Sequence, residues 1–67
     1  MTKIKIDVGR VKAGLASKGL TNEEAAEMVG ITQSRFRRIL SDGQCSSICL
    51  GRIARVLGMQ ALELVDV

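Results

Sequence analysis

A short segment in the middle of the chain, residues 31–41, contains three arginines and no acidic side chain. The preceding residues 22–30 are its opposite, with three glutamates and no basic side chain. Guanidinium, amide and hydroxyl groups all donate hydrogen bonds to anions. Such a cluster is either an ordinary solvated face or a surface for an anionic polymer, and charge alone does not decide between them. The donors concerned are Gln33, Ser34, Arg35, Arg37 and Arg38.

The two cysteines, Cys45 and Cys49, are the other candidates for chemistry. Their C-x3-C spacing is neither a redox C-x-x-C pair nor a zinc knuckle. The chain has no histidine, so two thiolates fall short of the four ligands that a structural zinc requires. We therefore expect free thiols in a reducing compartment, with no metal, no cofactor and no catalytic residue.

Length and composition favour a small helical protein. The 67 residues suit one domain over residues 1–67, and the 46% hydrophobic content supports a compact core. That core must be aliphatic, because Phe36 is the only aromatic residue. Neither a membrane span nor a signal peptide is predicted, so we expect a soluble cytoplasmic protein.

Capping and stop signals divide the first half of the chain into two helices. Asp7 can cap a first helix that Gly19 ends, and its apolar stripe is Val8, Val11 and Leu15. Gly14, inside this helix, either permits close packing or is a weak spot. Thr21 and Glu24 form a capping box for a second, two-turn helix that stops at Gly30.

Two further helices follow the same logic. Thr32 can cap a third helix, whose inner face gathers Phe36, Ile39 and Leu40. Ser34, Arg37, Arg38 and Ser41 occupy its outer side, with Arg35 on the flank. Residues 41–44 are typical of a turn, and Ser46 or Ser47 can cap a fourth helix that Gly58 ends. Its apolar residues are Leu50, Ile53, Ala54 and Leu57.

The C-terminal residues 59–67 are ambiguous. We expect a short fifth helix through about Val65, with a strand paired to residues 3–7 as the alternative. The predicted fold class is all-α, a compact bundle of four to five helices. A two-stranded ribbon from the termini stays open as an addition to it.

The residues around Gly30 suggest a family. Ala26 lies four residues before the glycine, and Phe36 and Ile39 lie six and nine residues after it. A small residue at a helix crossing, a glycine at the turn and apolar anchors suit a tight helix-turn-helix. The stretch GLTNEEAAEMVGITQSRFRRILSDG resembles the phage repressor and Cro-like (Xre-type) family of transcriptional regulators. The resemblance continues through LGRIARVLGM and implies a lambda-repressor-like helix-turn-helix, with the motif at about residues 21–41.

The resemblance implies sequence-specific binding of double-stranded DNA. The third helix, at about residues 33–41, would lie in the major groove as the recognition helix. Candidate base contacts are Gln33, Ser34, Arg37 and Arg38, with Arg38 preferred over Arg37. Candidate phosphate contacts are Lys18, Asn22, Arg35, Gln44 and Ser46. The glutamates of residues 22–30 should point away from the DNA.

The sequence also departs from the family pattern. Family members commonly have an Arg and a Glu where this chain has Leu15 and Leu40, so we predict that these two leucines touch. The proline often found near Cys45 is absent, and Ser47 and Ile48 are exchanged in polarity. These last two departures leave the start of the fourth helix open.

Partners follow from the same resemblance. Regulators of this type bind palindromic operators as homodimers, so we expect a small phage or mobile-element repressor that dimerises through its own surface. The interface candidates are Met59, Leu62, Val65 and Val67, or these side chains simply close the core. The alternatives are a protein-binding adaptor or an antitoxin built on the same fold. No small-molecule ligand is evident.

Overall fold

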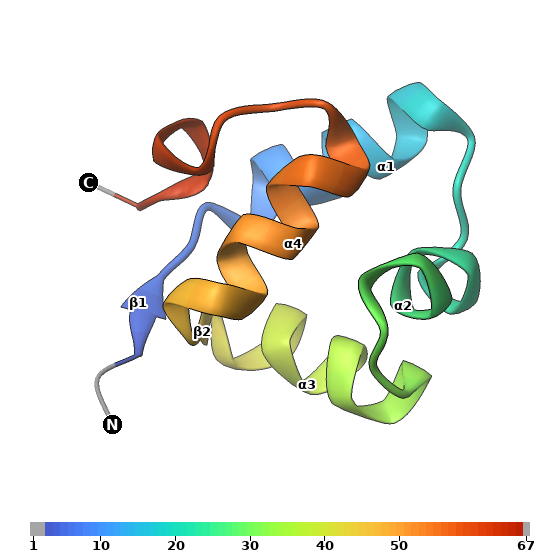
Figure 1. Ribbon diagram of the computed structural model, residues 1–67, viewed down its shortest axis with the longest axis horizontal. Coiled ribbons are helices and arrows are strands. Elements are labelled where there is room, and N and C mark those ends of the chain that lie inside the picture. Colours follow the sequence, from blue (N-terminus) through green and yellow to red (C-terminus); the bar gives the residue numbers. More distant parts are fainter. Residues whose placement is uncertain (1–2, 67) are drawn as a thin grey trace.

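The computed structural model describes residues 3–66 and is mostly helical, with one small antiparallel sheet (Figure 1). None of the helices formed by these residues has the length and apolar character that crossing a membrane requires. In chain order the elements are β1 (Ile4–Lys5), α1 (Val8–Lys18), α2 (Asn22–Val29), α3 (Gln33–Asp42), β2 (Gln44–Cys45), α4 (Ser47–Leu57) and the 3-10 helix η1 (Ala61–Leu64).

Each α-helix begins at a polar side chain that accepts a hydrogen bond from a backbone N–H of its first turn. Four such caps are present, Asp7, Thr21, Thr32 and Ser46, and Thr21 forms the full capping box with Glu24. Each helix ends at a glycine in the left-handed conformation, namely Gly19, Gly30, Gly43 and Gly58. The predicted caps and the three predicted helix stops are therefore confirmed. Of the two serines proposed for α4, Ser46 is the cap.

A continuous aliphatic core joins all four α-helices. The predicted inner-face residues Val11, Leu15, Phe36 and Ile39 are buried, together with the four apolar residues predicted for α4. Phe36 is among the largest of the fully buried side chains. Leu40 is half-buried against this core, which includes Leu15, while their direct contact stays a prediction.

Gly14 allows α1 and α4 to approach closely. A Cβ at Gly14 would lie only 3.0 Å from Cδ1 of Leu57, which is tighter than ordinary side-chain contact. Of the two interpretations of this glycine, close packing is therefore the one that the structure supports.

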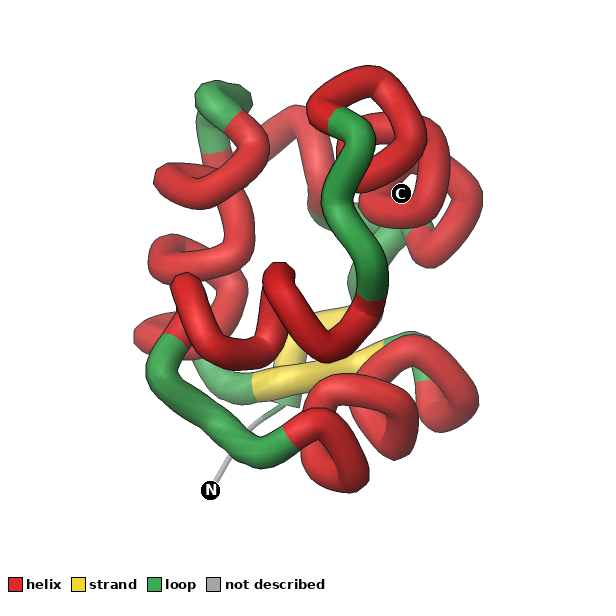
Figure 2. Tube along the Cα trace, turned by 90° about the vertical axis from the view of Figure 1, so that its right-hand side faces the viewer, coloured by secondary structure: helices red, strands yellow, loops and turns green. Residues whose placement is uncertain are grey.

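The sheet and the C-terminal segment differ from the prediction. β1 pairs with β2, Ile4 opposite Cys45 and Lys5 opposite Gln44, and the two strands lie side by side in Figure 2. Two-residue strands carry no periodicity, so the sequence offered no sign of β2. The C-terminal segment contributes only one isolated bridge, between Ile6 and Val65.

The predicted fifth helix through about Val65 is wrong, because one 3-10 turn takes its place. Within η1, Ala61 and Leu64 are three residues apart and so share a face in this tighter helix. Leu64 is fully buried, and its carbonyl accepts a hydrogen bond from the Asp7 N–H at 2.7 Å. The Asp66 N–H in turn donates to the Lys5 carbonyl at 3.0 Å. These bonds to the N-terminal segment replace the bonds that a longer α-helix would have formed.

Candidate nucleic-acid interface

The turn between α2 and α3 sets the direction of α3. Gly30 has φ 90° and ψ 29°, a conformation that residues with a Cβ rarely adopt. Its N–H donates to the Ala26 carbonyl at 2.9 Å, and the Ile31 N–H donates to the same carbonyl at 3.0 Å. Ala26 and Phe36 are buried on either side of this turn. The same contacts hold the opposite side of α3 toward solvent.

All four candidate base-contacting residues are exposed on the outer side of α3. Gln33 and Ser34 lie in its first turn, and Arg37 and Arg38 follow one turn later. One ion pair joins Arg38 Nε to Asp42 Oδ2 at 3.9 Å, with the Arg38 side chain 83% exposed. Donors from two turns of one helix thus share a single open surface.

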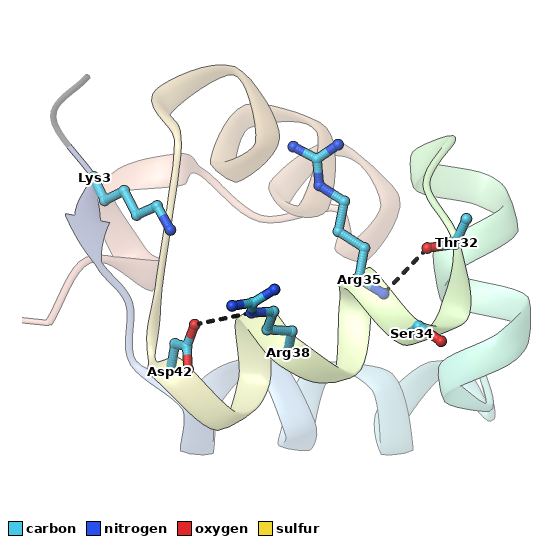
Figure 3. Close-up of a pocket in the computed structure, with 6 residues that line it drawn as sticks. All are labelled: Lys3, Thr32, Ser34, Arg35, Arg38 and Asp42. Carbon is cyan, nitrogen blue, oxygen red and sulfur yellow. Dashed lines mark hydrogen bonds and ion pairs between the residues drawn. The ribbon is translucent and has the colours of Figure 1, made fainter.

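A groove runs along one flank of this surface (Figure 3). It is lined by Lys3, Thr32, Ser34, Arg35, Arg38 and Asp42. Lys3 precedes β1, and its side chain extends toward α3 from the end of the groove opposite Thr32 and Ser34. Lys3 was not predictable from the sequence, because only the pairing of β1 with β2 brings the N-terminal segment beside α3.

Two more basic side chains reach α3 from other helices. Lys12 of α1 lines a second groove with Asn22 and Arg37, and Arg52 of α4 lines a third with Arg35. Neither was selected from the sequence, although the excess of bases in residues 1–21 hinted at the first. We use the name basic face for this whole set, Lys3, Lys12, Arg35, Arg37, Arg38 and Arg52.

The candidate phosphate contacts divide into two groups. Asn22 is the first residue of α2 and shares a groove with Arg37, while Ser46 shares one with Arg35. The Ser46 hydroxyl already accepts a hydrogen bond from the Cys49 N–H at 3.2 Å. All these groups lie next to α3.

Lys18 and Gln44 are placed differently. Lys18 Nζ would lie 3.5 Å from a Cβ at Gly58, so it sits where α4 ends, on the side of the molecule away from α3 (Figure 1). A positive charge at the carboxyl end of a helix is favourable, because the helix dipole places partial negative charge there. Gln44 is paired with Lys5 in the sheet. Neither side chain is brought together with the arginines of α3.

The glutamates of α2 are separated from the basic face. Glu23, Glu24 and Glu27 are exposed, and none of them lines the three grooves beside α3. Glu24 has a structural role, since its carboxylate accepts the Thr21 N–H at 3.1 Å. The glutamates of α2 therefore take no part in the three grooves that the basic side chains line.

The two cysteine thiols lie among apolar side chains of the core. Cys45 is buried in the core and Cys49 packs against it, and both are free. Burial, and then the neighbouring Cys49, raises the pKa of the Cys45 thiol from 9.0 to about 11. A thiol held in its protonated form is a poor nucleophile and a poor metal ligand. Residues 3–66 contain no group of three cysteine or carboxylate side chains that could hold a metal.

Of the three proposed dimer contacts that the structure describes, Leu62 is the exposed one, at 76%. Met59 and Val65 are half-buried and pack against the core, as the alternative interpretation expected. Val67 lies outside the described residues. The apolar surface available to a partner at this end of the molecule is therefore centred on Leu62.

Comparison with known proteins adds no relative to this picture. The chain has no significant match among protein-family models, curated proteins or solved structures. The function is therefore inferred from the placement and charge of its own side chains.

Proposed function

We propose that the protein is a sequence-specific regulator that binds double-stranded DNA through α3. The observation that carries this proposal is the outer side of α3, where Gln33, Ser34, Arg37 and Arg38 are all exposed on a helix held by Phe36 and Ile39. In this proposal α2 and α3 form a helix-turn-helix of the phage repressor and Cro-like type. α3 then enters the major groove, which is wide enough for one α-helix.

The donors on α3 match the acceptors of the major groove. The Gln33 amide can bond adenine N6 and N7, and an arginine can bond guanine O6 and N7. The Ser34 hydroxyl can form a hydrogen bond with more than one kind of base. These residues read the sequence, with Arg38 as the principal guanine contact.

The rest of the basic face binds the phosphates on either side of the groove. Arg35 and Lys3 line the groove along one side of α3, and Lys12 lines the groove along the other. The amino ends of α2 and α4 add backbone N–H groups, which favour anions. Separating the α2 glutamates from this face keeps repulsion of DNA low.

One module of this size offers few base contacts, so the proposal includes a twofold homodimer on a palindromic operator. Its two copies of α3 would then enter grooves about 34 Å apart, one helical turn of DNA. The surface proposed for dimerisation is centred on Leu62, which is exposed on η1.

Salt-dependent binding to a random-sequence duplex tests the proposal. With six phosphate contacts we expect affinity to fall about a thousandfold between 50 and 200 mM salt. Selection from a random DNA pool should then recover a preferred, twofold-symmetric sequence. A folded protein that fails to bind DNA at low salt would contradict the proposal and favour a protein-binding adaptor.

A further inference from the structure

One carboxylate lies within the basic face. Asp42, the last residue of α3, lines the same groove as Lys3 and Arg38. Its Oδ2 is 3.9 Å from Arg38 Nε, and Figure 3 shows the two side chains facing each other along the helix. This placement needs a reason, because a carboxylate at the carboxyl end of a helix is unfavourable and one facing DNA repels phosphate.

The pair joins Asp42 to only one edge of the guanidinium. Arginine carries five N–H donors, and the contact with Asp42 involves the Nε edge. Both terminal nitrogens, Nη1 and Nη2, remain available at the outer end of Arg38. The terminal edge of a guanidinium presents two parallel donors, the arrangement that fits guanine O6 and N7.

Arg37 lacks this arrangement. Its groove is lined by Lys12, Asn22, Leu40 and Ser41, with no carboxylate among them. Lys12, which lines the same groove, adds a second positive charge there and no partner for the Arg37 guanidinium. Two neighbouring arginines on one helix are therefore prepared for different tasks.

We propose that Asp42 is a positioning residue that determines specificity: it orients Arg38 toward guanine and lowers affinity for DNA lacking that guanine. The inference rests on the proposed function, because it assigns a role within the same surface. When guanine is present, Arg38 bonds it and Asp42 stays paired. When guanine is absent, the pairing with Asp42 competes with any contact of Arg38 to a phosphate, so DNA that lacks the guanine is bound less well.

Asp42→Asn tests the inference, because it keeps the side chain's shape and removes its charge. Glu63→Gln is the matched control, since it removes one exposed carboxylate on η1, away from α3 (Figure 1). The guanine bound by Arg38 is first identified as the position at which Arg38→Ala loses its base preference. Affinities are then measured for the sequence selected by the wild type, for variants of that sequence with another base at this position, and for random duplex. The double variant Asp42→Asn with Arg38→Ala completes a cycle.

We expect Asp42→Asn to lower the preference for that guanine about two- to fivefold, the range that one exposed ion pair supports. Random duplex should be bound more tightly, and Glu63→Gln should leave the guanine preference unchanged. In the Arg38→Ala background, Asp42→Asn should no longer affect base preference at that position.

Three results would overturn the inference while the proposed function stands. They are an unchanged guanine preference, an equal loss on all sequences, and a loss of preference for cytosine at a different position, which would make Asp42 a base reader itself. Failure of the folded wild type to bind any duplex is a separate result, and it overturns the proposed function together with the inference.

Discussion

The three arginines of α3 differ in their surroundings. Arg38 is paired with Asp42, whereas Arg37 shares a groove with Lys12 and Arg35 shares one with Arg52. A paired guanidinium is held for directional hydrogen bonding, whereas one beside another cation suits the diffuse charge of phosphates. The position of Arg38 on the helix already favours it for a base contact, and the pair with Asp42 adds a physical reason for this preference.

Arg38→Ala should therefore act on sequence recognition. We expect it to cost about 1–3 kcal/mol at one base position, because a bidentate contact is lost there. Arg35→Ala should weaken binding to every sequence and lower the salt slope by about one. Affinities for single-base variants of a selected site measure both effects. A uniform loss for Arg38→Ala would make Arg38 a phosphate contact.

Cys45 should make stability depend on pH in the alkaline range. The folded state holds the thiol proton up to about pH 11, whereas the unfolded state releases it near pH 9.0. The free energy of unfolding should therefore be unaffected below pH 9 and decrease as pH rises toward 11, on the order of 2 kcal/mol. Urea denaturation of wild type and Cys45→Ala over this range isolates the effect, since other groups titrate in both. Parallel pH profiles for the two proteins would contradict it.

At the scale of elements, the helices were predictable because their signals are local. Thr21 and Glu24 lie three residues apart and cap one helix end together, and Gly30 stops the same helix. Such features need no knowledge of the tertiary structure. β2 and η1 were missed for the opposite reason, because each is short and depends on hydrogen bonds with the N-terminal segment.

Two glycines should respond to alanine in opposite directions. Gly30→Ala should destabilise the protein by about 1–2 kcal/mol, because φ 90° is strained for a residue with a Cβ. Gly51→Ala should stabilise it by about 0.5–1 kcal/mol, since Gly51 lies within α4 and a Cβ there meets nothing within 4 Å. Thermal unfolding compares them directly. An unchanged or increased stability of Gly30→Ala would contradict the role assigned to Gly30.

At the scale of the whole molecule, the basic face is a product of topology. Lys3, Lys12 and Arg52 belong to three different parts of the chain and meet only around α3. A single sequence does not indicate that these three side chains lie close to α3. The α3 arginines were therefore predictable as candidate contacts, and the three neighbouring bases were not. Lys18 was predicted as a phosphate contact, but in the fold its side chain lies at the carboxyl end of α4.

Leu62 provides the test of dimerisation. Because its side chain is 76% exposed, Leu62→Glu should leave thermal stability of the monomer nearly unchanged. We expect it to weaken self-association and the binding of a palindromic site, while binding to one half-site is retained. Sedimentation and half-site titrations measure these separately. Unchanged self-association would place the dimer contact elsewhere.

The central claim is that the outer side of α3 is the surface that meets DNA. Titrating isotopically labelled protein with a duplex from the selected pool, and following each amide and guanidinium by nuclear magnetic resonance, tests this directly. We predict that the largest changes occur at Gln33, Ser34, Arg37 and Arg38, with smaller changes at Lys3 and Lys12. Changes centred on the glutamate-bearing side of α2, with the α3 signals unmoved, would contradict the account.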